Sequence, residues 1–473
     1  MEISTRLISG NEDETAVFAE SHSGGLSLVF RFSLDVTRPL STNSRIVACF
    51  HDIEVDDEKK TFSDRESMRQ GIYDLISHVW PLCASNPSIR LPDVIVHIQQ
   101  DDDGQTTFRI SHESAFREYL ASLLPVSSIK DALIPQARTT KLHYIPLESL
   151  QFSDLLGGRG GTTVTHLKDQ KDGESYVYKG LSFRLFLEGD AVYTSERDTF
   201  YRELGVVYSL PSHPNVLRAP PLLVTTGPPQ SANHGIAEKD CLVCGTLYPF
   251  LERQSLQEVI SRSNENHSTL PLTAKAKWAC QIASAMATVH SSGQYHMDLK
   301  PSNMLLNNED DVIIIDWEQC GASPFFLAPE ADGSWDVEVV INAEPAEVKE
   351  RMPRQNVFQL WQLECPRALE AAEVYSVGCS LWVMFEQSED KWTYDRRQPE
   401  AKEIVWTETS ESVPEAWKDF VSRCMSLDAN KRPTFEQGEE FLEARMAATW
   451  GAYQVEFMMI HDTECNVNYL ALL

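Results

Sequence analysis

The feature that most constrains this chain is a polar segment at residues 295–307, YHMDLKPSNMLLN, which is followed by the apolar run VIIID. The segment places Asp298, Lys300 and Asn303 within six residues, and the proline between them favours a loop over a helix. The apolar run predicts a buried strand, so we expect Asp316 at the end of a strand, facing a cleft. The sequence therefore predicts three kinds of polar group held close together.

These groups suit the transfer of a phosphoryl group. An aspartate and an asparagine oxygen are hard ligands, of the kind that Mg²⁺ uses while it keeps waters and phosphate oxygens. A second aspartate that binds no metal can accept or orient a hydroxyl proton. A lysine beside it can stabilise charge on the transferring group. A metal, a base and a cation together predict phosphoryl transfer.

At these residues the chain resembles the eukaryotic-type protein kinases. The H-R-D-x-x-x-x-N motif of that family appears as HMDLKPSN at 296–303, and its D-F-G motif appears as DWE at 316–318. The DWE form and the short FLAPEA segment also resemble a divergent kinase-like group of filamentous fungi. The resemblance implies roles for five side chains: Asp298 as catalytic base, Lys300 at the γ-phosphate, Asn303 and Asp316 at the metal, and His296 as a structural residue.

The resemblance covers residues 150–447 and adds further motifs in the family's order. YVYKG resembles the V-A-I-K strand, FYREL resembles helix C, LYPFL resembles the hinge, and FLAPEA and LDANKRPTF resemble later segments of the fold. Five more residues receive roles by resemblance: Lys179 at the α/β-phosphates, Glu203 as its partner, Leu251 with backbone groups for adenine, and Glu330 and Arg432 as an ion pair.

The glycine-rich segment LLGGRGGTTV departs from the family pattern. Its glycines, Gly157, Gly158, Gly160 and Gly161, are interpreted together with Val164 as the loop over the nucleotide phosphates. Backbone amides can approach phosphates along such a segment, because glycine permits conformations closed to other residues. A plain β-turn is the alternative interpretation.

A second departure concerns control. Met297 stands where many kinases carry an arginine that receives an activation-loop phosphate, and the segment after the DWE motif is short, with Ser323 as its one hydroxyl residue. We therefore expect activity that does not depend on phosphorylation of this segment. A Ser323→Ala variant that loses activity would contradict this expectation.

Three further features depart from the family pattern, and two of them leave alternatives open. Glu318 occupies the glycine position of D-F-G, where it either tunes metal affinity or restricts the flip that glycine permits. Glu373 replaces an aspartate of the family, a change of one methylene that is expected to keep its hydrogen bonds to the catalytic-loop backbone. About 42 residues at 331–372 form an insertion, either a specificity element or a lid over the helical lobe.

The length and pattern of the chain predict two domains and a tail. A chain of 473 residues is too long for one core. Residues 1–140 read as an α+β domain of unknown role, residues 150–447 as the kinase-like domain and 448–473 as a tail. The predicted fold class is α+β, a bilobal protein-kinase-like fold with a small β-rich lobe and a helical lobe, preceded by the extra domain.

Charge and cysteine content bear on partners and location. Lys and Arg number 41 against 70 Asp and Glu, a formal charge of −29 that disfavours nucleic acid and anionic membranes as partners. The ten cysteines lack the spacing of a disulfide scaffold, and the N-terminus lacks the pattern of a signal peptide. We expect a cytoplasmic protein, with the nucleus as the alternative, and the oligomeric state stays open.

The combined motifs predict an ATP- and Mg²⁺-dependent kinase that phosphorylates Ser or Thr in proteins. Every side chain that the family uses at phosphate, metal or acceptor is present in this sequence. Two alternatives remain: a pseudokinase that binds nucleotide or a partner without turnover, and a phosphotransferase that acts on a small molecule. The APE segment and its arginine disfavour the second alternative.

Overall fold

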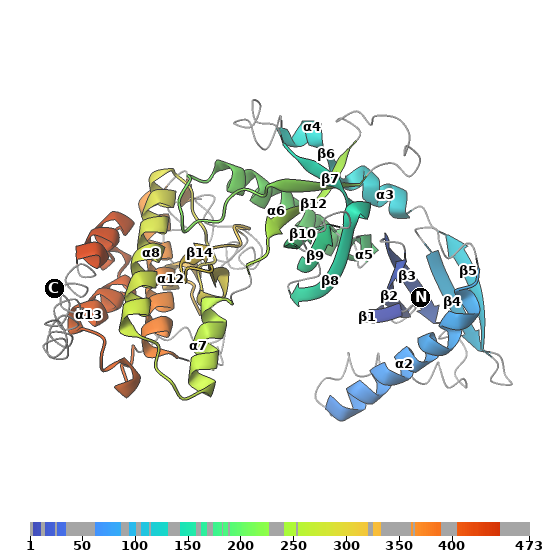
Figure 1. Cartoon of the computed structure of the whole chain (residues 1–473), viewed down its shortest axis with the longest axis horizontal. Coiled ribbons are helices and arrows are strands. Elements are labelled where there is room, and N and C mark those ends of the chain that lie inside the picture. Colours follow the sequence, from blue (N-terminus) through green and yellow to red (C-terminus); the bar gives the residue numbers. More distant parts are fainter. Residues whose placement is uncertain are drawn as a thin grey trace, which may run out of the picture. The chain divides into compact units, whose positions relative to one another are not determined.

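The computed structural model places the described residues in two compact units (Figure 1). The first comprises Met1–Asp198 and Pro220–Phe250, and the second Thr199–Ala219 and Leu251–Leu473. Within them the structure describes residues 3–10, 15–23, 26–34, 62–86, 94–100, 106–112, 115–130, 142–157, 162–167, 174–181, 183–187, 190–226, 241–251, 254–319, 325–332, 361–362, 365–388 and 404–444.

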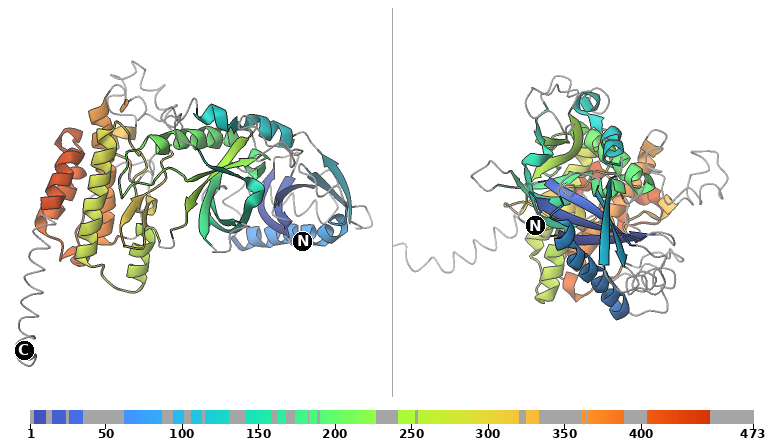
Figure 2. Two further views of the ribbon diagram at one scale, coloured as in Figure 1. Left: turned by 45° about the horizontal axis from the view of Figure 1, so that its top comes forward. Right: turned by 90° about the vertical axis from the view of Figure 1, so that its right-hand side faces the viewer.

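A five-stranded sheet opens the first unit. Its strands lie in the order β1 (Ile3–Gly10), β2 (Thr15–Ser23), β3 (Leu26–Leu34), β4 (Val94–Gln100) and β5 (Thr106–His112). Only the β3–β4 pair is parallel, and helix α2 (Phe62–Cys83) lies in the connection that a parallel pair requires (Figure 2). The hairpin β4–β5 lies in the run DVIVHIQQDDDGQTTFRI, and α2 lies in SDRESMRQGIYDLISHVW; the first pattern predicts a hairpin and the second a helix.

A second sheet in this unit carries the predicted phosphate-binding lysine. Its order is β7-β11-β12-β10-β9-β8, with β6 beside β12. The bounds are β6 Leu124–Pro125, β7 Tyr144–Pro146, β8 Leu150–Gly157, β9 Thr162–Leu167, β10 Ser175–Gly180, β11 Leu222–Thr226 and β12 Leu242–Pro249. Strands β9, β10 and β12 lie in the runs GTTVTHL, SYVYKGL and CLVCGTLY, whose alternating or apolar pattern predicts strands.

Residues from the predicted N-terminal domain pack onto this second sheet. Helix α3 (Ala115–Ser122) precedes β6, and its Tyr119 hydroxyl donates to the carbonyl of Leu181 at 2.7 Å. The Tyr119 ring also contacts Phe186 of the short helix α5 (Phe183–Leu187). Helix α3 of the 1–140 segment is therefore bonded to the residue that follows β10, the strand of Lys179, while the boundary near residue 140 stays a prediction.

The second unit is mainly helical. Its helices include α7 (Leu256–Glu265), α8 (Leu272–Ser291), α12 (Pro366–Glu386) and α13 (Glu415–Cys424), with a two-stranded hairpin of β13 (Met304–Leu306) and β14 (Val312–Ile314). Helix α6 (Asp190–Ser209) enters this unit at Thr199. Helices α8 and α12 lie side by side in Figure 1 and pack together in the core.

The run TAKAKWACQIASAMATVH at 273–290 has the apolar spacing that predicts a helix, and it lies in α8. Its expected apolar face, Trp278, Ile282, Met286 and Val289, is buried. Gly293 follows with φ +75°, a left-handed backbone that glycine adopts without a steric penalty and that terminates helices. This ending directs the chain from α8 into the polar segment at 295–307.

Helix α12 forms the centre of the second unit. It is long and apolar enough to cross a membrane, but 94% of its apolar window is buried inside the protein. A helix that is hydrophobic on all sides is also what the core of a large domain requires. Burial therefore identifies α12, among the described helices, as a core helix.

Candidate active site

The predicted catalytic residues come together in the HMD loop, defined as residues 296–303. Lys300 Nζ lies 2.5 Å from Asp298 Oδ2, and Asn303 Nδ2 donates to both the carbonyl oxygen and Oδ2 of Asp298, at 2.9 and 3.2 Å. A 3₁₀ turn at Pro301–Asn303 folds the loop back on itself. The side chains of Asp298 and Lys300 are 14% and 26% exposed, so a carboxylate and an ammonium group both reach the surface at one point.

The second predicted metal ligand lies beside this loop. Strand β14 ends at Ile314, and the next residue, Ile315, donates its N–H to the carbonyl of Asn303 at 3.0 Å. This bond joins the backbone of Asn303 to the residue that precedes Asp316. Asp316 has φ +68°, a conformation that residues other than glycine adopt rarely and mostly at functional sites.

His296 joins the HMD loop to the DWEQ loop, defined as residues 316–319. Its Nδ1 accepts the N–H of Asp298 at 3.1 Å, so its Nε2 carries the proton that is donated to the carbonyl of Ile315 at 2.8 Å. The imidazole is fully buried, and its ring centroid lies 4.6 Å from that of Trp317. The His296 ring thus bonds to backbone groups on both sides of the contact between the loops, and its structural role stays a prediction.

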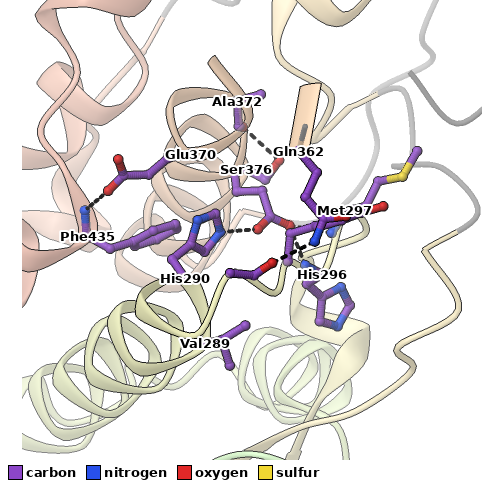
Figure 3. Close-up of polar contacts among 12 residues, drawn as sticks. Val289, His290, His296, Met297, Gln362, Glu370, Ala372, Ser376 and Phe435 are labelled. Carbon is purple, nitrogen blue, oxygen red and sulfur yellow. Dashed lines mark hydrogen bonds and ion pairs between the residues drawn. The ribbon is translucent and has the colours of Figure 1, made fainter. Parts of the chain in front are cut away.

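The HMD loop is also held by hydrogen bonds to Glu373 of α12. The carboxylate is 1% exposed, and its Oε1 accepts the N–H groups of His296, at 2.8 Å, and of Met297. Its Oε2 bonds to Nε2 of His290, at the end of α8; Figure 3 shows His290 and the two loop residues around this contact. Met297 has φ +78°, so Glu373 fixes the most strained residue of the loop. The hydrogen bonds that the sequence analysis expected of Glu373 are present.

The surroundings of Glu373 keep it ionised. Burial alone raises the pKa of its carboxyl, but the hydrogen bond and charge of His290 and the amide of Met297 counteract burial, and the pKa lies below its usual value. His290 was not predicted from the sequence. A histidine in the last turn of a helix has no local feature that marks it as the partner of a residue 83 positions away.

The predicted pair of Glu330 and Arg432 is present. The guanidinium binds the carboxylate through both nitrogens, with Nη2 to Oε2 at 2.9 Å, and the Arg432 side chain is fully buried. Arg432 also donates to the carbonyls of Ser426 and Ala371, at 2.8 and 3.0 Å. This bidentate pair fixes the FLAPEA segment to the chain beyond α13.

The remaining predicted residues are distributed over both units. Lys179 lies on β10, opposite Thr246 of β12, and Val164 lies on β9, where its side chain is buried. Glu203 is buried on α6, and Leu251 begins the second of the two stretches that make up the second unit. Gly157 ends β8, whereas Gly158, Gly160, Gly161, Ser323 and residues 333–360 of the insertion lie outside the described residues.

The donor set of the two loops fits Mg²⁺. Asn303 and Asp316 offer an amide and a carboxylate oxygen, the hard ligands that Mg²⁺ takes. Across the described part of the chain, no three His, Cys, Asp or Glu side chains gather as they would in a metal site made of protein alone. A metal at Asn303 and Asp316 would thus need further oxygens from water or from a phosphate group.

Comparison with known proteins points the same way. Residues 151–324 match the model of the protein kinase domain. The chain is 26% identical over 293 residues to mitogen-activated protein kinase kinase kinase mlk-1 of Caenorhabditis elegans. This match covers 58% of this chain and 24% of the worm protein. It is 24% identical over 217 residues to serine/threonine-protein kinase PknD of Protochlamydia amoebophila, covering 41% of this chain and 21% of that protein.

A mouse protein matches over more of its own length. The chain is 23% identical over 292 residues to serine/threonine-protein kinase 16 of Mus musculus, covering 60% of this chain and 85% of the mouse protein. In contrast, the chain spans about a quarter of the worm kinase and about a fifth of the bacterial one. What these matches share is therefore the kinase domain.

Proposed function

This chain carries a protein kinase domain of the eukaryotic-type superfamily, with a β-sheet N-lobe and a helical C-lobe, and on that premise we propose that it transfers the γ-phosphate of ATP to Ser or Thr hydroxyls of proteins with Mg²⁺. A protein kinase domain in general implies ATP and a divalent metal. Because the identity to the relatives is low, the activity and the acceptor are inferred from this chain's own residues.

The contact between the HMD and DWEQ loops carries the proposal. The Ile315 N–H bonds to the carbonyl of Asn303, and the Asn303 side chain bonds to Asp298. One connected network therefore includes the predicted base, one predicted metal ligand and the residue that precedes the other. A chance loop with the same sequence has no reason to form this network.

Each side chain has a defined task in the proposed reaction. The Asp298 carboxylate orients the acceptor hydroxyl and accepts its proton. The Lys300 ammonium, held 2.5 Å from that carboxylate, stabilises negative charge on the transferring phosphoryl group. Asn303 and Asp316 hold Mg²⁺, which when bound neutralises charge on the phosphates. Lysine at position 300 supports the Ser/Thr branch of the family, as the resemblance implies.

Phosphate transfer from labelled ATP to a basic protein acceptor tests the proposal. We expect Asp298→Asn to lower the rate about 10²- to 10⁴-fold, the usual contribution of a positioned acid or base. Asp419→Asn is the matched control, because Asp419 is an exposed aspartate of α13 in the same unit. Labelled phosphoserine or phosphothreonine in the acid hydrolysate identifies the acceptor. Equal rates in Asp298→Asn and wild type would refute the proposed role of Asp298.

Thermal shift separates a working kinase from a scaffold. A ligand that binds the folded state stabilises it by RT ln(1 + [L]/Kd), about 2.7 kcal/mol at a hundredfold excess over Kd. A shift with ATP and Mg²⁺ but no transfer to any protein acceptor would favour a nucleotide-binding pseudokinase. Transfer to metabolites but not to proteins would favour the small-molecule phosphotransferase.

A further inference from the structure

The DWEQ loop has a backbone that needs support from outside. Two of its four residues, Asp316 and Gln319, have left-handed backbones, with φ of +68° and +53°. Each such residue costs on the order of 1 kcal/mol or more, and the strain persists only where neighbouring groups hold it. The loop contains no glycine, because Glu318 occupies that position of the motif. Side chains that fix this backbone therefore control where Asp316 points.

Arg202 of α6 supports the loop from one side. Its Nε donates to the carbonyl of Glu318 at 3.2 Å, and its Nη2 donates to Thr199 Oγ1, one turn earlier on the helix, at 3.2 Å. The second bond orients the guanidinium plane, so that the first is directed at the loop. A charged donor makes a stronger hydrogen bond to a carbonyl than a neutral donor does.

Gln319 supports the loop from the other side. Its side chain is 4% exposed, and Nε2 donates to the carbonyl of Tyr295 at 2.7 Å. Tyr295 directly precedes the HMD loop, so this bond joins the DWEQ loop to the segment that carries Asp298 and Asn303. Between the two supports, Trp317 is fully buried, and its indole N–H donates to the carbonyl of Ile314 at 3.2 Å.

We propose that Arg202 and Gln319 are positioning residues that hold the DWEQ loop in the conformation in which Asp316 can share a metal with Asn303. The inference rests on the proposed function of the two ligands. Neither residue is assigned to the metal or to phosphate, and both act through the loop backbone. Loss of either bond is expected to weaken Mg²⁺ binding, because groups that orient metal ligands typically change metal affinity 10- to 100-fold.

Five variants of the full chain test the proposal. Arg202→Met and Gln319→Leu remove the donors while keeping side-chain length or bulk. Arg197→Met is the control for the first, because Arg197 lies on the same helix and pairs with its neighbour Asp198. Gln362→Leu is the control for the second, because Gln362 also donates to a backbone carbonyl, that of Gly293 at 2.6 Å, but is not itself a residue of either loop. Arg202→Lys keeps a charged donor and is expected to retain part of the Mg²⁺ affinity that Arg202→Met loses.

The measured quantity is the Mg²⁺ concentration that gives half-maximal phosphate transfer at saturating ATP. We expect it to rise about tenfold in Arg202→Met and Gln319→Leu, with kcat at saturating Mg²⁺ close to that of wild type. A merely structural role would lower kcat and the melting temperature in parallel and leave this concentration unchanged. Unchanged half-saturation in both variants of a working kinase would overturn the inference and leave the proposed function intact.

A binding readout makes the test independent of turnover. The same Mg²⁺ titration is followed by thermal shift in the presence of a non-hydrolysable ATP analogue. A curve displaced to higher Mg²⁺ in the two variants, but not in the two controls, supports the inference even if no acceptor is found. Coincident curves, or a wild-type protein without any Mg²⁺-dependent shift, overturn it.

Discussion

Removal of Arg432 is expected to destabilise the helical unit severely. The guanidinium is fully buried, binds Glu330 through both nitrogens and donates to the carbonyls of Ser426 and Ala371. It also lies over the ring of Tyr375, with its central carbon 4.9 Å from the ring centroid. Arg432→Met keeps an unbranched apolar stem but leaves a carboxylate that is 5% exposed without its cation.

The magnitude follows from the charge left behind. Removing one partner of a buried ion pair costs about 3–5 kcal/mol, against a total stability of about 5–15 kcal/mol for a domain. A urea titration followed by tryptophan fluorescence measures the loss, since Trp278, Trp317, Trp382 and Trp417 are buried in the same core. With a urea dependence of about 2 kcal/mol per molar, the midpoint is expected to fall by about 2 M.

A double-mutant cycle separates the uncompensated charge from lost packing. The double variant Arg432→Met with Glu330→Gln removes both charges, so it is expected to be more stable than Arg432→Met alone. Lys431→Met is the control, because that neighbour is 74% exposed and lies 3.7 Å from its partner Asp428. A loss below about 1 kcal/mol for Arg432→Met, or a double variant that loses the sum of both singles, would refute the reasoning.

Three further predictions concern the same unit. Burial lowers the pKa of Lys275, whose Nζ donates to the Phe385 carbonyl, to about 8. Between about pH 8 and the ordinary pKa of 10.5, the unfolded chain then binds more protons than the folded chain, so the free energy of unfolding is expected to rise with pH. Lys275→Met should lack this rise when urea midpoints are compared at about pH 7.5 and about pH 10. Because the folded state lowers the pKa of Glu373, its carboxylate is expected to stabilise the fold above the ordinary value of 4.5 and to lose that contribution as the pH falls, so Glu373→Gln should show a flatter acid-unfolding curve. Gly378→Ala places a Cβ 2.7 Å from the Cβ of Cys424, and we expect a loss of about 1–3 kcal/mol in thermal unfolding, whereas Gly438→Ala, with its nearest contact at 3.3 Å, should be tolerated better.

The sequence indicated which residues of the candidate site lie close together better than it indicated the contacts that hold them. Asp298, Lys300 and Asn303 lie within six residues, so their proximity is a property of the chain itself. The strand before Asp316 was visible from its apolar run. In contrast, Arg202 meets the DWEQ loop across 116 positions, and no local pattern encodes that contact.

The elements of the first unit were predicted unevenly for a similar reason. Alternating or apolar runs gave β3, β9, β10 and β12, and helical spacing gave α2, where Ile76 and Val79 are buried as expected. Strands β1 and β2 were missed, because their mixed polar sequences show neither period clearly. The packing of α3 on the second sheet was also missed, since periodicity predicts a buried face but not the surface that covers it.

Strained backbones gather at the two predicted catalytic loops. Six described residues other than glycine have positive φ, and three of them, Met297, Asp316 and Gln319, lie in or next to the predicted catalytic groups. Glu373 holds the first of these through its amide, and Arg202 holds the DWEQ loop through a carbonyl. Both contacts come from helices of the same unit and require no phosphate. A chain whose two loops are fixed in this way has less need of an arginine at position 297, which agrees with the expectation that activity does not depend on phosphorylation of the segment after the DWEQ loop.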